Sequence, residues 1–458
     1  MYRLDPASTT PLHIQLYEAI KADIIAHYRV GDKLPSIRKV AQTYHLSKTT
    51  VESAYSQLYA EGYIESRPRS GYYVGDYRYE VGQVSSASIQ EVPTSESYRY
   101  DFFPAQLDGR DFPHKLWRRL CMQVMQAEPD MGAYPDGQGE WGLREAIARY
   151  VADSRGVVCG ADQVVITHGF ADAMGLLAKL VRRDYGVFGI ESPGYHLAWK
   201  VFDEYGYAIR RIPTTAQGLD IQALKASDAQ IVYITPSHQY PTGVTMPIAA
   251  RLELIEHMRD IGGLIIEDDY DSELAYATRP IPSLQGLDRY DRVVYMGTFA
   301  KSLSPALRIG YMVFPRHLLP RFAQSYDAHF ARAGLLTQLT LERFIRGGHY
   351  ERHLRRIRTL NRKKHDRMLA LFARYLGATY EVLASGGGLA ILIMPTVPFA
   401  WDRFFDAARR ERIKLYMAHE RSGGDFEAIR MGFGGFGLEE LDEAVAAFAR
   451  VWKEGISL

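Results

Sequence analysis

Apolar side chains recur at helical spacing in the first sixty residues of the chain. A stripe with a period of four predicts a helix from Pro11 to His27, which Gly31-Asp32 then ends. The stripe consists of Leu12, Leu16, Ile20 and Ile24. Ser36 can cap a second short helix. The inner face of that helix carries Ile37, Val40, Ala41 and Tyr44.

A third helix and a hairpin follow this pair. Ser47 is placed to cap the third helix and Gly62 to end it. Its buried positions are Val51, Ala54, Tyr55 and Leu58. Residues 63–66 and 72–74 then predict short strands on either side of a turn at 67–71. Three helices with a terminal hairpin are typical of an α/β winged helix-turn-helix that reads DNA.

From about residue 98 the pattern changes to short apolar runs separated by helical segments. The runs lie at 163–167, 186–191, 230–235, 264–268 and 293–296. This alternation predicts an α/β domain with a largely parallel sheet covered by helices on both faces. Residues 76–97 are rich in Ser, Glu, Gln, Tyr and Thr without a sustained apolar period, which predicts a linker. The expected organisation is therefore multidomain: a DNA-binding domain at 1–75, a linker at 76–97 and a second domain at 98–458.

The composition narrows the class of protein. The chain has 458 residues, of which 47% are hydrophobic and 24% charged, and its net charge is +1. We expect a globular protein of two or three domains, without a global field that attracts nucleic acid or membrane. Its two cysteines exclude a disulfide framework and a cysteine-based metal site, and no metal is expected. Because an apolar signal segment and a membrane span are both lacking, we expect a cytoplasmic protein with no membrane partner.

The segment 11–75 resembles the GntR type of winged helix. A recognition helix presents short polar and basic side chains from its first turn to base edges and phosphates. The third predicted helix begins with Ser47, Lys48, Thr49 and Thr50. Contacts with phosphates or the minor groove are expected from Arg38, Arg67 and Arg69. Residues 1–75 hold nine Lys and Arg against seven Asp and Glu, so charge alone leaves a three-helix protein-interaction module as the alternative.

The segment Met296-Gly-Thr-Phe-Ala-Lys301-Ser-Leu-Ser-Pro-Ala-Leu-Arg308 resembles the lysine motif of the aspartate-aminotransferase group. These fold-type I enzymes use pyridoxal 5′-phosphate (PLP). The resemblance extends from about residue 98 to the end of the chain and implies a large, mostly parallel sheet domain with a smaller α+β domain. It also implies that Lys301 carries the PLP aldehyde as a Schiff base, while Arg308 and Thr298 bind the cofactor phosphate.

An acidic cluster ends the apolar run at 264–268, at the edge of the sheet where ligands bind in open α/β folds. By resemblance, Asp268 pairs with the pyridine nitrogen of PLP and Tyr270 bonds its O3′ hydroxyl. For Asp269 and Asp271 the simplest interpretation is that acids after a strand begin a loop.

Other segments supply the remaining parts of the predicted cofactor site. Gly169, Phe170 and Ala171 form a turn from a strand into a helix, where backbone N–H groups can face a phosphate. The resemblance implies that Tyr195 stacks on the cofactor ring. It also implies that Tyr134 reaches the phosphate of a neighbouring subunit, and hence a homodimer with shared sites.

Arg430 matches the late arginine with which this group of enzymes grips a substrate carboxylate. A guanidinium can bind a carboxylate through two parallel hydrogen bonds, so Arg430 points to an amino-acid ligand. The alternative is an arginine at the surface or at the edge of the core.

Two positions depart from the aminotransferase pattern. Tyr240 stands where these enzymes have Asn before the Pro-Thr-Gly turn, and Ala300 stands where a serine commonly precedes the lysine. Both departures put efficient transamination in doubt. Tyr240 in Ser-His-Gln-Tyr-Pro-Thr-Gly resembles the MocR subfamily, which joins a GntR-type head to an aminotransferase-like domain.

The resemblance implies a transcriptional regulator that binds a DNA operator and senses an amino acid, an amine or PLP itself through Lys301. The main alternative is a working PLP-dependent aminotransferase with an accessory DNA-binding head. A third is a dimeric scaffold that has lost PLP. Outside the motifs, residues 343–367 hold ten Lys and Arg against two Asp and Glu on a predicted helix. A solvated helix face is the ordinary interpretation, and a surface that attracts DNA phosphates is the alternative.

Overall fold

The computed structural model describes residues 2–6, 8–76, 97–276, 281–384, 386–419 and 427–456. The chain divides into two compact units, Met1–Glu96 and Ser97–Leu458. The expected linker at 76–97 lies outside the described residues except for its two end positions. Within the described ranges, no helix is long and apolar enough to cross a membrane.

The N-terminal unit is the predicted winged helix-turn-helix. Its elements are α1 (Leu12–His27), α2 (Ile37–Tyr44), α3 (Lys48–Ala60), β1 (Ile64–Arg67) and β2 (Gly71–Val74). Both predicted serine caps are present: the Ser36 hydroxyl accepts the backbone N–H of Lys39, and the Ser47 hydroxyl accepts that of Thr50 at 3.1 Å. The helices bury one shared core, which includes all four predicted positions of α3. The hairpin pairs β1 with β2 in antiparallel register.

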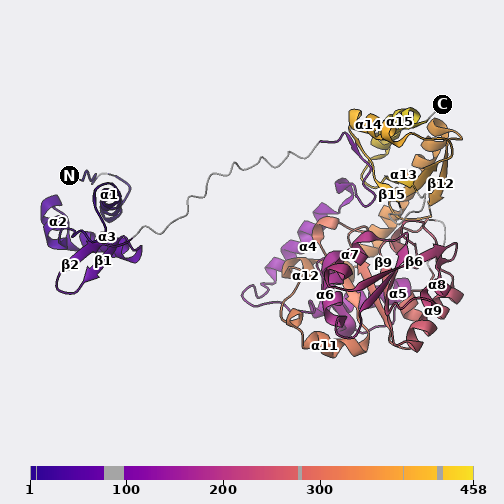
Figure 1. Cartoon of the computed structure of the whole chain (residues 1–458), viewed down its shortest axis with the longest axis horizontal. Helices are drawn as coiled ribbons and strands as arrows, with labels where there is room; N and C mark the ends of the chain where they lie inside the picture. Colours follow the sequence, from indigo (N-terminus) through magenta and orange to yellow (C-terminus); the bar gives the residue numbers. More distant parts are fainter. Residues whose placement is uncertain are drawn as a thin grey trace. The chain divides into compact units, whose positions relative to one another are not determined.

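The second unit is built on an eight-stranded mixed sheet (Figure 1). In spatial order its strands are β4 (Val164–Thr167), β11 (Gly310–Val313), β10 (Val293–Thr298), β9 (Leu264–Asp269), β8 (Ile231–Ile234), β5 (Val187–Ser192), β6 (Ala208–Thr215) and β7 (Gly218–Leu219). Strands β10, β9, β8, β5 and β6 run parallel to one another, whereas β11 is antiparallel to both of its neighbours. The five predicted apolar runs are β4, β5, β8, β9 and β10, each within two residues at either end.

Helices cover both faces of this sheet because alternate residues of a strand point to opposite sides. Ile231 and Tyr233 pack with α6 (Phe170–Val181), α7 (His196–Glu204) and α11 (Leu319–Ala323). Val232 and Ile234 pack on the other face, which is covered by a second set of helices. These are α5 (Trp141–Arg155), α8 (Ile221–Lys225), α9 (Ile248–Asp260), α10 (Leu284–Leu287) and α12 (Leu335–Arg346), with α4 (His114–Gln126) against α12.

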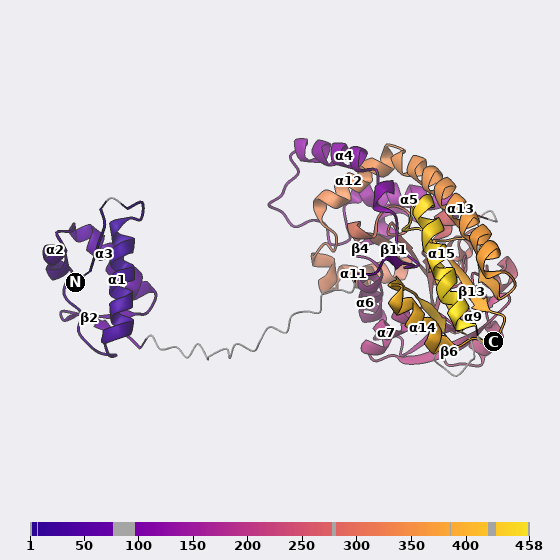
Figure 2. The same ribbon diagram turned by 90° about the horizontal axis from the view of Figure 1, so that it is seen from above.

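A smaller four-stranded sheet forms a separate lobe of the same unit. Its strands, in spatial order, are β12 (Tyr380–Ala384), β13 (Ala390–Pro395), β16 (Glu427–Gly432) and β15 (Met417–His419). One face is covered by α13 (His349–Leu376), α14 (Trp401–Arg410) and α15 (Leu438–Gly455), and α13 runs beside α15 (Figure 2). A two-stranded parallel pair joins β3 (Tyr100–Asp101) to β14 (Ile413–Lys414). A larger, mostly parallel domain and a smaller α+β domain were therefore predicted correctly.

Candidate functional site

A cavity of about 770 Å³ lies where the parallel strands of the large sheet end. Segments that follow β5, β8, β9 and β10 line it, and the smaller sheet contributes residues of β15 and β16. The carboxyl ends of parallel strands meet at one edge, so distant parts of the sequence converge there. Nine of the predicted site residues line this cavity: Gly169, Phe170, Tyr195, Asp268, Tyr270, Thr298, Lys301, Arg308 and Arg430.

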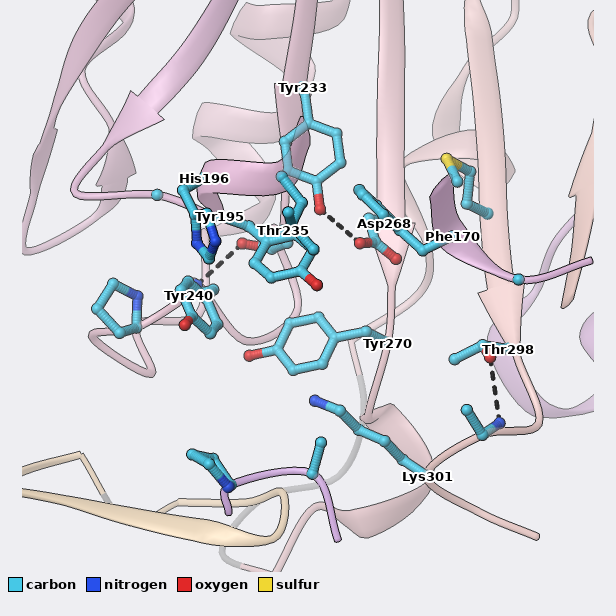
Figure 3. Close-up of a pocket in the computed structure, with 18 of the residues that line it drawn as sticks. Phe170, Tyr195, His196, Tyr233, Thr235, Tyr240, Asp268, Tyr270, Thr298 and Lys301 are labelled. Carbon is cyan, nitrogen blue, oxygen red and sulfur yellow. Dashed lines mark hydrogen bonds between the residues drawn. The ribbon is translucent and has the colours of Figure 1, made fainter. Parts of the chain in front are cut away.

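Asp268 is a buried carboxyl group at the end of β9. The hydroxyl of Tyr233, on the neighbouring strand β8, donates a hydrogen bond to its Oδ2 at 2.5 Å (Figure 3). Burial raises the pKa of Asp268 to about 7, although the bond from Tyr233 and the charge of Lys301 oppose this shift. A carboxyl group held this way can pair with a basic ring nitrogen, which would return it to the ionised form.

Lys301 follows β10 and points into the cavity under the ring of Tyr270 (Figure 3). Its Nζ lies 3.8 Å from the centre of that ring. Burial lowers the pKa of Lys301 to about 8; the carboxylate of Asp271 opposes the shift, and the charge of Arg430 adds to it. An amine with this pKa is partly uncharged near neutral pH, and the uncharged form is the one that attacks an aldehyde. The hydroxyl of Tyr270 donates to the backbone carbonyl of His238 at 2.9 Å.

Gly169, Arg308 and Thr298 form one corner of the cavity, whose hydrogen-bond donors are the kind that suit an anion. Gly169 precedes α6 with φ +87°, and a Cβ there would lie 2.6 Å from Nη2 of Arg308. Nη2 donates to the backbone carbonyl of His168 at 3.2 Å. The Thr298 hydroxyl oxygen accepts the N–H of Ala300, which leaves its own proton for a ligand. The first N–H groups of α6 have no acceptor within the helix, so helix, guanidinium and hydroxyl converge on one place for a phosphate.

Tyr195 and Tyr240 stand at the opposite wall of the cavity, with Arg430 beside them. The Tyr195 ring meets Phe170 edge-on at 5.0 Å and Tyr240 at 5.3 Å between ring centres. Arg430 lies on β16, and its Nη1 donates to the Tyr240 hydroxyl at 2.5 Å. Thus the smaller sheet contributes a guanidinium to a cavity whose other predicted groups come from the large sheet.

Two predicted cofactor residues do not line this cavity. Ala171 lies in the first turn of α6, where only its backbone N–H is placed for an anion. The side chain of Tyr134 is 83% exposed and makes a ring contact with Phe330. Its predicted role concerns the site of a second copy and stays a prediction.

Comparison with known proteins identifies the family of this chain. Residues 12–74 match the family described as "Bacterial regulatory proteins, gntR family", and residues 106–448 match "Aminotransferase class I and II". The "Probable rhizopine catabolism regulatory protein MocR" of Rhizobium meliloti is 33% identical over 412 residues, which cover 86% of this chain and 83% of that protein. The chain belongs to the MocR-type GntR regulators.

The HTH-type transcriptional regulator YdeL of Bacillus subtilis (strain 168) is similar to this MocR-type regulator over its whole length. The two are 36% identical over 453 residues, 97% of each chain. Among solved structures, LysN, the α-aminoadipate aminotransferase of Thermus thermophilus, matches with a TM-score of 0.69 and 24% identity, over 77% of this chain and 92% of that one. This likeness shows the fold, that of the aminotransferases. The protein is an HTH-type transcriptional regulator that binds DNA and carries an aminotransferase-like domain for PLP.

The residues of the cavity fit PLP. A partly uncharged lysine, a buried carboxyl group, the ring of Tyr195 and a corner of phosphate-binding donors are the groups that its aldehyde, pyridine nitrogen, ring and phosphate require. Lys301 would hold the aldehyde, Asp268 the nitrogen, and Arg308 with Gly169 the phosphate. Tyr240 and Ala300, the two positions that depart from the aminotransferase pattern, do not remove any of these groups.

Several contacts beside the regulator's cavity were not expected from the sequence. Asp269 does more than begin a loop, because it is buried against Arg155 Nε at 2.6 Å and also accepts the Tyr295 hydroxyl at 2.7 Å. Asp271 likewise pairs with His238 Nδ1 at 2.9 Å. These ion pairs depend on strand register and on packing between distant segments, so no local sequence motif predicts them.

The predicted DNA contacts of the regulator lie on the N-terminal unit. Lys48 and Thr49 are exposed in the first turn of α3, where Thr50 is half-buried, and Arg38 is exposed in the first turn of α2. Ser47 is exposed too, but its hydroxyl serves as the cap of α3, so its first role is structural. In the hairpin, Arg67 stacks on Tyr73 at 4.2 Å and the exposed Arg69 occupies the turn with φ +63°. Their contacts with DNA stay predictions.

Proposed function

We propose that this regulator senses an amine-bearing ligand, an amino acid in particular, at the Lys301 site and changes its DNA affinity in response. When bound, PLP would supply an aldehyde that reacts reversibly with primary amines, and Lys301 would hold that aldehyde in the resting protein. The observation that carries the proposal is that one cavity holds both this lysine and Arg430, a guanidinium without a carboxylate partner among the described residues. An amino group and a carboxylate on one ligand match these two groups.

The placement of the two groups suggests how binding reaches the rest of the protein. Lys301 belongs to the large sheet and Arg430 to the smaller one. A ligand that contacts both stabilises one relative position of the two lobes. Such a ligand alters DNA binding only to the extent that it prefers one protein state over the other.

A homodimer with shared sites is part of the proposal. Large apolar side chains are exposed on α4 and on the segment that follows it: Met122, Met125, Met131, Tyr134 and Trp141. A second copy of the chain would cover this surface, because contiguous apolar side chains in water mark interaction sites. A dimer would present two DNA-binding heads to an operator with paired half-sites. The proposed location is the cytoplasm, where operator DNA and PLP are both present.

An absorbance titration coupled to a DNA-binding assay tests the proposal. Purified protein is loaded with PLP and titrated with amino acids and amines, and operator affinity is measured on the same samples. We expect a cofactor absorbance band that is absent in Lys301→Ala. One class of ligand should shift this band and change the DNA affinity in the same samples. If the cofactor turns over to its amine form with release of a keto acid while DNA affinity stays constant, the protein is an aminotransferase with an accessory head. A protein that binds DNA but never acquires the band is a scaffold without PLP.

A further inference from the structure

The cavity extends beyond the residues assigned to the cofactor, along the edge of the large sheet. After Tyr195 the chain enters α7, and the first two turns of this helix contribute Leu197, Trp199 and Lys200 to the cavity wall. Arg211, on strand β6, lines the same cavity. We call the part lined by Leu197, Trp199, Lys200 and Arg211 the α7 extension. None of the predicted cofactor anchors belongs to it.

Arg211 is held in the α7 extension by a ring contact. Its guanidinium carbon lies 5.2 Å from the centre of the Trp199 ring. Such a stack engages one face of the planar group and leaves the N–H donors at its edge available. Neither Arg211 nor Lys200 has an ion-pair partner among the described residues, and both side chains are exposed. The α7 extension therefore offers two cations that can bind an anion.

The lining of the whole cavity has an excess of positive charge. Among the residues that the structure describes, its acidic side chains are Glu191 and Asp268, against five Lys and Arg side chains: Lys200, Arg211, Lys301, Arg308 and Arg430. Glu191 is buried and accepts the backbone N–H and the hydroxyl of Thr235, at 3.1 and 3.0 Å. Burial raises the pKa of Glu191 to about 7, so its negative charge is only partly present near neutral pH.

Three of these cations have roles in the proposed function, in which Lys301 and Arg308 hold the cofactor and Arg430 binds the α-carboxylate of the ligand. Lys200 and Arg211 remain for a second anion. Lys301 follows β10 and Arg211 lies on β6, with β9, β8 and β5 between these two strands. Neighbouring strands are about 4.8 Å apart, so β10 and β6 are separated by about 19 Å. A ligand that reaches from one side chain to the other therefore needs a side chain of several carbon atoms.

The start of α7 also favours negative charge. The helix begins at His196, which lies beside Tyr195 with 5.7 Å between ring centres, and its first turn contains no acidic residue (Figure 3). The first N–H groups of a helix carry a partial positive charge. The acidic residues of α7, Asp203 and Glu204, come in its last turn and do not line the cavity. Helix and side chains thus act on an anion in the same sense.

We propose that the α7 extension is a second anion-binding site, in which Arg211 and Lys200 bind a negatively charged group at the far end of the ligand's side chain. This inference rests on the proposed sensing function and narrows it: the ligand is an α-amino acid whose side chain carries its own anionic group. Arg430 on the smaller sheet and Arg211 on the larger one then bind different anionic groups of one ligand.

Matched pairs of acidic and neutral amino acids test this site, with a carboxylate as the probe. The PLP-loaded full-length protein is titrated with L-aspartate, L-glutamate, L-2-aminoadipate and L-2-aminopimelate, and with the side-chain amide of each. The apparent Kd is taken from the change in the cofactor absorbance band. The members of a pair have the same length and differ in the charge at the end of the side chain. In the longest pairs we expect the acid to bind about tenfold or more tightly than the amide, and the preference should be smallest for aspartate.

Variants without the two charges assign the preference to the α7 extension. In Lys200→Gln/Arg211→Gln the Kd of the acid should rise to within about twofold of that of the amide, while the Kd of the amide changes less than twofold. Arg183→Gln removes an exposed cation outside the cavity, and as the matched control it should leave every Kd unchanged. Because both cations are exposed, the wild-type preference for the acid should also decrease as the salt concentration rises.

Four results would overturn the anion site: equal affinities for acid and amide in every wild-type pair, a preference that is largest for aspartate, a preference that the double variant retains, or equal losses for acid and amide in that variant. In each of these cases the cofactor band still responds to amino acids, so the sensing function stands. A wild-type band that responds to no amino acid, acidic or neutral, would overturn the sensing function and this inference with it.

Discussion

Replacement of Gly169 by alanine is expected to weaken PLP binding by an amount that can be measured separately from its effect on the free energy of unfolding. Gly169 has φ +87° and ψ −175°, a region that residues with a Cβ avoid at a cost of about 1–3 kcal/mol. The new methyl group would lie 2.6 Å from Nη2 and 3.1 Å from Cζ of Arg308. The arginine end is flexible, so it can move aside, but it then loses its bond to His168 and leaves the place where a phosphate would bind.

The magnitude follows from the contacts that Arg308 loses. A hydrogen bond between a guanidinium and a charged oxygen contributes about 1.5–3 kcal/mol, and each 1.4 kcal/mol corresponds to about a tenfold change in Kd. We therefore expect Gly169→Ala to weaken PLP about 10- to 100-fold, whereas the cofactor-free protein loses only the backbone cost. PLP titrations followed by absorbance give the first quantity, and denaturant unfolding of the cofactor-free protein gives the second.

The chain offers a matched control for this experiment. Gly206 also has a positive φ, +79°, and a Cβ there would lie 3.7 Å from Nη2 of Arg182; neither residue lines the cavity. Gly206→Ala should destabilise the fold without changing PLP affinity. In an Arg308→Ala background, Gly169→Ala should add less than threefold to the loss of affinity. If Gly169→Ala binds PLP as tightly as the wild type while Arg308→Ala binds weakly, the coupling of Gly169 to Arg308 is refuted.

Three further predictions concern charge. Burial raises the pKa of Glu273 to about 7. The protonated side chain therefore stabilises the fold fully below about pH 4.5, and this stabilisation is lost as the pH rises through 7. Because glutamine does not ionise, the Tm of Glu273→Gln should rise relative to that of the wild type between pH 5 and 7.5, and a constant difference in Tm would contradict this. Arg155→Met should cost about 3–5 kcal/mol in denaturant unfolding because it leaves the buried carboxylate of Asp269 without its ion-pair partner. Loss of the exposed Arg210–Asp228 pair should leave the unfolding midpoint almost unchanged, because exposed ion pairs contribute little to stability. Three exposed cations of α13 have no ion-pair partner among the described residues: Arg355, Arg362 and Lys363. If α13 contacts DNA phosphates, reversal of these three charges should reduce the salt dependence of DNA binding by about one to three units of log–log slope. An unchanged slope would exclude that role.

Much of the fold could be predicted because local patterns specify it. Helix caps at Ser36 and Ser47 depend on residues three positions apart, and the strands of the large sheet are continuous apolar runs. The lysine and acid motifs of the cavity are likewise short segments, Lys301 after β10 and Asp268 at the end of β9. Such signals lie within a few residues of the features that they predict.

The partners of these residues could not be predicted in the same way. The bond from Tyr233 to Asp268 requires that β8 and β9 pair in the register that puts Tyr233 opposite Ile266, two residues before the acid. The contact of Tyr240 with Arg430 joins positions 190 residues apart, one in the turn after β8 and the other on β16 of the smaller sheet. Pairing register and lobe packing are properties of the assembled fold, and a single sequence carries no local signal for them.

The separation of the site between two sheets also bears on how such regulators diverge. Every predicted anchor of the cofactor that lines the cavity belongs to the larger sheet and its loops, while Arg430 comes from the smaller one and Tyr240 stands between them. Under the proposed function, substitutions at Arg430 are therefore expected to alter which ligand is recognised while PLP affinity stays unchanged. Related regulators can in this way come to recognise different ligands while they keep the same PLP chemistry.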